Sequence, residues 1–260
     1  MTFTDQTGRT VECHNKLTRI VSLVPSQTEL LVDLGLEDNI VGVTKFCVHP
    51  KHLRISKKVI GGTKTISFEK IKALKPHIIL CNKEENTLDI VNQLEKEFPV
   101  HVSDVTNIEE SKTLILQYGK LFGCIMRASR MCSIITKEAD KFTAFIADKP
   151  KKRTAYFIWK DPWMTIGKDT FIHYLLSLNQ FENIYQDKER YPEVDLEDLK
   201  EKNPELLLLS SEPYPFKEKH INEIQSTFPE TKIILVDGEY FSWYGSRLQN
   251  AFTYFRTLHA

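Results

Sequence analysis

The chain has 260 residues, of which 41% are hydrophobic, and its 35 basic and 35 acidic side chains balance. This length suits two small domains better than one average domain. The balanced charge provides no general attraction to nucleic acid or to an anionic membrane, so we expect a globular protein without a nucleic-acid partner.

Short apolar runs alternate with amphipathic stretches along the whole chain. Strand-like runs lie at 19–24, 40–43, 77–81, 100–105, 154–159, 205–209 and 232–236. Helical patterns lie between them at 28–34, 68–74, 88–97, 171–178, 196–202 and 220–227. This alternation predicts an α/β fold with parallel sheets that helices cover on both faces.

An internal repeat divides the chain into related halves. The segment 68–80 reappears at 196–208, and both copies predict a helix with an acidic first turn, a proline that ends it and a buried strand. Residues 36–40 have a counterpart at 181–184, and 98–99 have one at 228–229. We therefore expect two Rossmann-like lobes, at 1–107 and 151–260, joined by linking helices at 108–150.

The linking segment predicts helices at 108–122 and 126–146 with a break at Gly123. The second helix has an apolar stripe at Ile134, Ile135, Ala139, Phe142 and Ile146. A stiff helix of this kind would limit how far the lobes swing apart. The alternative is an ordinary helix inside one continuous domain.

The cysteines and the N-terminal residues provide evidence about the cellular compartment of the protein. The five cysteines are scattered without a C-x-x-C pair, which signals neither a disulfide framework nor a zinc knuckle. The first residues show no basic region followed by an apolar stretch, and no apolar run is long enough to span a bilayer. We expect no signal peptide in this chain, which fits either a trimmed exported protein or a cytosolic one.

In open parallel sheets, ligands bind beyond the carboxyl ends of the strands. The loops at these ends are 25–28, 45–49, 82–86, 160–163, 210–216 and 238–244. The loops of the second half are rich in aromatic residues, which suits a large, flat, partly apolar ligand; the alternative is that single rings cap the core. These aromatic residues are Trp159, Trp163, Trp243, Tyr214, Phe216, Tyr240, Phe241 and Tyr244.

Polar candidates are fewer, and each has a plain alternative. Ser26 and Glu29 have the spacing of a helix capping box. Cys47 and His49 are a close pair of soft metal ligands in a loop, but two ligands do not make a site. Arg247 suits a ligand carboxylate or phosphate, and a solvated arginine at a helix start is the alternative.

Glu69 and Glu197 occupy equivalent places in the repeat, each near a helix N-terminus. Favourable interaction with the helix dipole is a sufficient explanation for either residue. Their paired placement also predicts two exposed carboxylates, one per lobe, that are presented to basic residues of a two-fold partner.

Motifs typical of enzymes are missing. The chain has no G-x-S-x-G, G-x-G-x-x-G or H-E-x-x-H, and the glycines at 61–62 lack the spacing of a phosphate-binding loop. We therefore expect a binding protein that is not an enzyme and has no intrinsic cofactor. The rival interpretation is an intracellular enzyme or ligand chaperone on the same lobes, with Cys47 and His49 as working groups.

Motifs in a specific order resemble the helical-backbone (class III) solute-binding proteins of ABC importers, most closely the vitamin B12-binding type. They are D-x-x-G-R at 5–9, R-I-V-S-L-V-P-S-x-T-E at 19–29, V-G-V at 41–43, G-G-T at 61–63, L-K-P at 74–76, K-P-K-K-R at 149–153 and Y-P-x-V at 191–194. The resemblance covers nearly the whole chain.

The resemblance implies two α/β lobes bridged by a long helix, with a metal-containing ligand between them. Cobalamin or another corrinoid is the leading ligand, ahead of haem and ferric siderophores. It implies a periplasmic monomer, with a cytoplasmic location as the alternative, whose Glu69 and Glu197 dock on a permease dimer. Thr63 and Tyr191 replace tryptophans of the vitamin B12-binding type. The expected ligand-binding residues are Phe46, Thr63, Trp159, Trp163, Tyr191, Glu212, Tyr214, Trp243, Tyr244 and Arg247.

Overall fold

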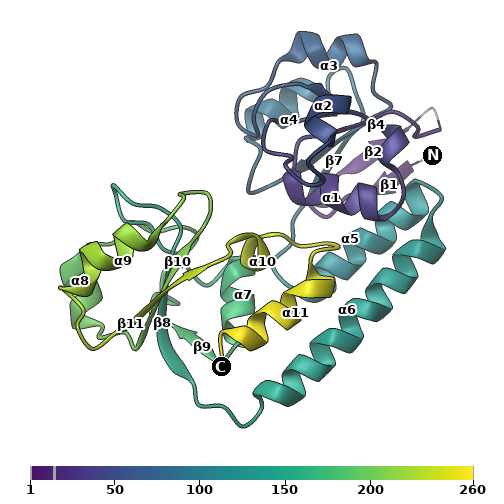
Figure 1. Ribbon diagram of the computed structural model, residues 1–260. Helices are drawn as coiled ribbons and strands as arrows, with labels where there is room; N and C mark the ends of the chain where they lie inside the picture. Colours follow the sequence, from purple (N-terminus) through teal and green to yellow (C-terminus); the bar gives the residue numbers. More distant parts are fainter. Residues whose placement is uncertain (1, 14–15, 260) are drawn as a thin grey trace. The chain divides into compact units, whose positions relative to one another are not determined.

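The computed structural model describes residues 2–13 and 16–259 and divides into two compact units. Unit 1 comprises Met1–Thr136 and Tyr244–Gln249, and unit 2 comprises Lys137–Trp243 and Asn250–Ala260. The predicted domain boundaries at 107 and 150 remain a prediction. The two units are described separately below (Figure 1).

Unit 1 contains a five-stranded parallel sheet in the order β5-β4-β3-β6-β7. The strands are β3 (Ile20–Ser22), β4 (Ile40–Val43), β5 (Lys58–Val59), β6 (Ile78–Asn82) and β7 (Val100–Ser103). The accompanying helices are α1 (Pro25–Asp33), the 3-10 helix η1 (Glu37–Asn39), α2 (Leu53–Ser56), α3 (Phe68–Leu74), α4 (Leu88–Leu94) and α5 (Ile108–Leu121).

Successive side chains of the edge strand β7 enter different layers, because Val100 and Val102 join the core of Ile79 and Cys81 whereas His101 does not. Ile79 and Cys81 of β6 belong to a core with Ile71 of α3 and Leu94 of α4. His101 of β7 instead has an edge-to-face ring contact with Tyr118 of α5, at 5.2 Å between centroids. Because side chains alternate along a strand, the fully apolar runs seen in the sequence cover both faces of the sheet, as predicted.

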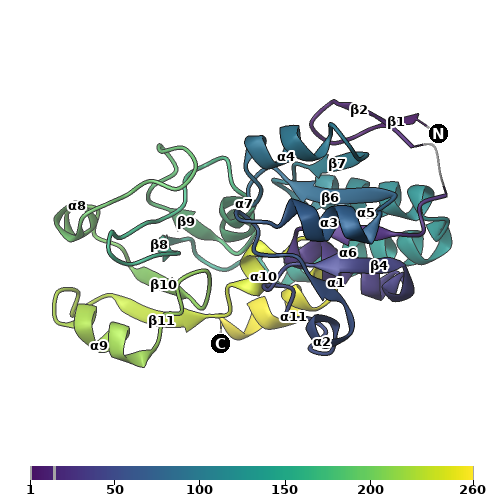
Figure 2. The ribbon, with the colours of Figure 1, turned by 90° about the horizontal axis from the view of Figure 1, so that it is seen from above.

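Unit 2 contains a four-stranded parallel sheet in the order β11-β10-β8-β9. The strands are β8 (Lys152–Phe157), β9 (Phe181–Asn183), β10 (Leu206–Ser210) and β11 (Lys232–Val236). Helices α8 (Leu196–Glu201) and α9 (Glu218–Gln225) lie on one face, and α7 (Phe171–Leu178) and α10 (Glu239–Ser242) lie on the other (Figures 1 and 2). The last helix is α11 (Leu248–Thr257).

Successive side chains of β8 again point to opposite faces of the sheet and enter two separate layers of the core. Phe157 packs with Leu199 of α8 and Ile224 of α9. Tyr156 points the other way, and its ring centroid lies 5.2 Å from that of Phe241 in α10. The predicted α/β fold, with two lobes built on parallel sheets, is confirmed.

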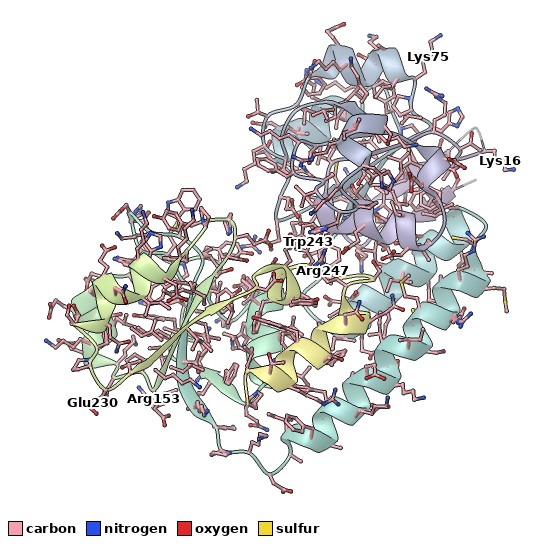
Figure 3. The ribbon with its side chains drawn as sticks, viewed as in Figure 1. Lys16, Lys75, Arg153, Glu230, Trp243 and Arg247 are labelled. Atoms are coloured by element: carbon pink, nitrogen blue, oxygen red, sulfur yellow. The ribbon has the colours of Figure 1, made fainter. Side chains whose placement is uncertain are left out.

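The internal repeat extends to the backbone conformation. The order β9-β8-β10-β11 reproduces the order β4-β3-β6-β7, so the two sheets share one topology. The N-cap side chains of Ser67 and Asp195 accept hydrogen bonds at the starts of α3 and α8. Lys75 and Asn203, which follow these helices, both have φ of 45°, and each precedes a proline. Lys75 is labelled in Figure 3.

The expected long helix is α6 (Ile125–Ile146), which follows Gly123 with its φ of 72°. Its buried side chains are Ala128, Met131, Cys132, Ile135, Phe142 and Ile146. The predicted stripe was wrong at Ile134, which is 37% exposed. Ile134 lies one residue from Ile135, so a helix turns it about 100° away from the buried stripe.

An N-terminal hairpin, β1 (Thr2–Thr4) and β2 (Thr10–Glu12), was not expected from the sequence. Asp5 at its turn holds it against the sheet of unit 1. The Asp5 carboxylate accepts hydrogen bonds from the backbone of Thr7 and Arg9 and from Val102 N, at 3.0 to 3.1 Å. Within the described ranges, no helix has the length and apolar character needed to cross a membrane.

Candidate ligand-binding site

Sheet topology identifies one point in each unit where a ligand site is expected. The strand order reverses direction between β3 and β6 in unit 1 and between β8 and β10 in unit 2. Loops that leave the carboxyl ends of such strand pairs diverge, which opens a crevice there. The residues that follow these strands are therefore the first candidates in each unit.

After β8 of unit 2, the two tryptophans have different surroundings. Trp159 is 39% exposed, and its ring meets Tyr214 edge to face at 5.6 Å. Trp163 stacks on Phe216 at 5.8 Å and meets Phe157 at 5.1 Å. Trp159 is thus available to a ligand, whereas Trp163 mainly covers the core between the sheet and its helices.

After β10, the Glu212 carboxylate is held by residues that follow β11. Its Oε1 accepts hydrogen bonds from Ser242 Oγ at 2.6 Å and from Trp243 Nε1 at 2.9 Å. Burial and the nearby acids Glu239 and Asp237 raise the pKa of Glu212 above its ordinary value, against the effect of these two donors. Trp243 itself is only 7% exposed, so its indole supports the carboxylate more than it offers a stacking surface.

In unit 1, Phe46 provides an exposed ring in the loop after β4. It is 49% exposed, and Lys45 Nζ lies 4.9 Å from its ring centroid. A Cβ atom on Gly62 would lie 3.2 Å from the Phe46 ring, so the absence of a side chain at this position lets the ring lie against the backbone. Asn86 Nδ2 donates to Thr63 O at 2.9 Å and fixes the neighbouring turn.

Tyr244 lies in unit 1, where its hydroxyl joins a buried network. Gln27 Nε2 donates to Tyr244 Oη at 2.9 Å and to Ser103 Oγ at 2.6 Å, and Tyr118 Oη donates to Gln27 Oε1 at 2.6 Å. Burial raises the pKa of Tyr244, which keeps the phenol protonated. The network positions Tyr244 firmly; its predicted contact with a ligand stays a prediction.

Arg247 forms a two-pronged ion pair inside unit 1. Its Nε and Nη2 donate to the two carboxylate oxygens of Glu29, at 3.0 and 2.7 Å. The predicted capping box was therefore wrong: α1 starts at Pro25, its N-cap is Val24 without a side-chain cap, and Glu29 reaches Arg247 instead. Burial raises the pKa of Glu29 despite this pair. A ligand role for Arg247 remains a prediction.

The surroundings of Cys47 do not favour a metal. The thiol is buried, and its Sγ lies 3.1 Å from Thr28 Oγ1 and 3.3 Å from Thr44 Oγ1. Burial raises the pKa of Cys47, whereas metal binding needs the thiolate. Residues 2–13 and 16–259 contain no cluster of three or more His, Cys, Asp or Glu that could hold an ion. The metal role of Cys47 and His49 stays a prediction.

The remaining predicted residues lie at the surface or partly exposed. The Arg190 guanidinium lies 5.7 Å from the centroid of the half-buried Tyr191 ring. Glu69 and Glu197 are both exposed in the first turns of α3 and α8, at matching positions of the repeat. Equivalent exposure of the two carboxylates is what the docking hypothesis requires.

The sequence analysis missed the supporting residues Gln27, Asn86, Gly238 and Ser242. They contact the predicted residues from distant parts of the chain, and no local motif identifies them. All four lie in the loops 25–28, 82–86 and 238–244 that follow predicted strands, and this position was the one signal that could have been used.

The chain belongs to the periplasmic binding protein family, whose sequence profile matches residues 20–232. It is 26% identical over 216 residues to an uncharacterized ABC transporter substrate-binding lipoprotein, YvrC, of Bacillus subtilis (strain 168), which covers 80% of this chain and 68% of the relative. It is also 26% identical over 194 residues to a vitamin B12-binding protein of Yersinia pestis (strain Pestoides F), covering 74% and 69% of the two chains.

Among solved structures, the periplasmic vitamin B12 binding protein BtuF of Vibrio cholerae superimposes with a TM-score of 0.82. The match covers 94% of this chain and 98% of the other at 20% identity, so the likeness shows the fold. The family and fold expected from the sequence motifs are confirmed.

Proposed function

We propose that this protein is the substrate-binding component of an ABC importer and that it captures a bulky metal chelate. A corrinoid such as cobalamin is the leading ligand, ahead of haem and ferric siderophores. Membership of the periplasmic binding protein family supports this function, as does the vitamin B12-binding relative. A periplasmic location follows from the same proposal.

The observation that carries the ligand class is the pair of exposed rings at carboxyl edges of the two sheets. Phe46 of unit 1 and Trp159 of unit 2 are 49% and 39% exposed. Exposed aromatic rings bury much area on a flat ligand and lose little side-chain entropy. With no three-residue metal cluster in the described ranges, the metal would arrive inside its own chelate.

Absorbance after desalting tests the ligand. The protein is incubated with cyanocobalamin, haemin or a ferric hydroxamate siderophore, and retained chromophore is measured. We expect cyanocobalamin to be retained, and Trp159→Ala to weaken its binding about tenfold, which corresponds to ~1.4 kcal/mol. Phe145 is also 39% exposed but lies on α6, so Phe145→Ala is the matched control. Retention of none of the three chelates would refute the proposal.

We further propose that Glu69 and Glu197 dock on basic residues of a two-fold permease. In cells that express the cognate permease, the double substitution Glu69→Ala and Glu197→Ala should abolish uptake and leave ligand affinity unchanged. Glu12 and Glu230 are exposed carboxylates outside α3 and α8 and serve as control positions (Glu230, Figure 3). A loss of ligand affinity in the double variant would contradict this division of labour.

A further inference from the structure

Glu212 lies at the switch point of unit 2. It follows β10 by two residues, and β10 pairs with β8 on one side and β11 on the other. The crevice rule places a ligand at this edge of the sheet. Glu212 is half-buried there, on the same edge as Trp159.

The backbone of Glu212 is fixed as firmly as its carboxylate. Ser210 Oγ donates to Glu212 O at 2.6 Å and accepts a hydrogen bond from Tyr156 Oη at 3.1 Å. A Cβ atom on Gly238 would lie 2.8 Å from Glu212 Cγ and 2.2 Å from Ser210 Oγ, so only glycine fits beside this side chain. Together with the two donors to Oε1, these contacts hold the carboxylate in one orientation.

The charge of Glu212 is nevertheless uncompensated. Its two donors, Ser242 and Trp243, are neutral, and no basic side chain among the described residues forms an ion pair with it. Its acidic neighbours Asp237 and Glu239 add negative potential. A half-buried carboxylate without a cation is costly, and a rigid support that preserves it is typical of a recognition residue.

A ligand can supply the positive charge, or the further hydrogen-bond donor, that Glu212 lacks within the protein. An N–H donor or a cationic group placed at Glu212 gains a charge-assisted hydrogen bond. A ligand carboxylate or phosphate at the same place meets like charge, which selects against it. Resting on the function proposed above, we infer that Glu212 determines ligand charge: it favours a neutral or cationic chelate with hydrogen-bond donors at its periphery and rejects chelates with anionic groups there.

Binding of two probes to the full chain tests this inference. Cyanocobalamin carries peripheral amides, and haemin carries two propionates. Glu212→Gln keeps the shape of the side chain and removes its charge. We therefore expect it to lower the affinity for cyanocobalamin about tenfold and to raise the affinity for haemin at least fivefold. Glu230→Gln removes an exposed carboxylate that precedes β11, away from the carboxyl edge of the sheet, and should change either affinity less than threefold. Ser242→Ala keeps the charge and should preserve the preference for cyanocobalamin.

Circular dichroism and cooperative urea unfolding of each variant establish that the unit is folded. If wild-type protein binds a chelate and Glu212→Gln leaves both affinities unchanged, this inference fails while the proposed function stands. Tighter binding of haemin than of cyanocobalamin to wild-type protein also overturns it. If wild-type protein binds no chelate, the proposed function fails and the inference fails with it.

Discussion

Arg19 and Arg153 serve as equivalent helix caps in the two units. Arg19 Nη2 donates to Leu74 O at 2.6 Å, at the end of α3, and Arg153 Nη2 donates to Lys202 O, at the end of α8. Arg153 is labelled in Figure 3. Arg19 directly precedes β3 and Arg153 is the second residue of β8, which are inner strands of the two sheets. Cationic groups stabilise the carbonyls that end a helix.

We expect Arg19→Ala to lower the free energy of unfolding by about 1–2 kcal/mol, because Leu74 O loses a charged donor in a partly buried place. Arg153 is exposed, so Arg153→Ala should cost less than about 1 kcal/mol. Urea unfolding followed by circular dichroism measures both. Equal losses would contradict the role of burial.

Asp5 should make the stability of unit 1 depend on pH. Burial acts to raise the pKa of Asp5, but hydrogen bonds from Arg9, Thr7 and Val102 outweigh it, so the pKa lies below its ordinary value. A lowered pKa contributes stability above the unfolded value, near pH 4, and this stability is lost as pH falls through the folded value. We expect Asp5→Asn to cost about 1–3 kcal/mol at pH 7 and less at pH 3. A pH-independent loss would show that the charge is irrelevant.

The ion pair of Glu29 and Arg247 should show strong coupling. Their side chains are 18% and 12% exposed, so removal of one partner leaves a poorly solvated charge behind. We expect Glu29→Gln and Arg247→Met to cost about 2–3 kcal/mol each and the double variant to cost less than their sum. A double-mutant cycle from denaturant unfolding measures this coupling, and strict additivity would contradict it.

Thiol labelling should distinguish one cysteine from the other four. Cys124 is partly exposed, whereas Cys13, Cys47, Cys81 and Cys132 are buried. Burial raises the pKa of Cys81 to about 12 and that of Cys132 to about 11, which keeps both as unreactive thiols. At pH 8 we expect one rapid reaction with a disulfide reagent, absent in Cys124→Ser, and four more after unfolding. Rapid labelling of Cys47 would contradict its burial and would support its predicted role as a working group.

Much of the fold could be predicted because long periodic segments carry their own signal. The ranges of β4, β11, α3 and α7 agree with the expected ones. The missed strands β5 and β9 have only two and three residues, too few for periodicity to register. The hairpin depends on Asp5 contacting Val102, a contact between residues far apart in sequence.

The candidate site was predictable only to the level of loops. Their positions after strands follow from sheet topology, but packing decides which ring stays exposed, as the contrast between Trp159 and Trp163 shows. Arg247 finds Glu29 across 218 positions of sequence. Periodicity describes only residues that are close along the chain, so it cannot predict contacts between residues far apart in sequence.

Unit 1 is discontinuous in sequence, which has a consequence for biosynthesis. The segment Tyr244–Gln249 belongs to unit 1 and contacts three of its earlier residues. Gly245 N donates to Ser111 Oγ at 2.9 Å, Tyr244 bonds Gln27, and Arg247 pairs with Glu29. During translation, Gln27, Glu29 and Ser111 leave the ribosome early. Their contacts with residues 244–249 can form only after nearly all of the chain has been translated. A nascent chain released before residue 244 would lack these contacts: Gln27 would keep its hydrogen bonds with Tyr118 and Ser103, but Glu29 would lose its arginine, so unit 1 would be less stable than in the full chain.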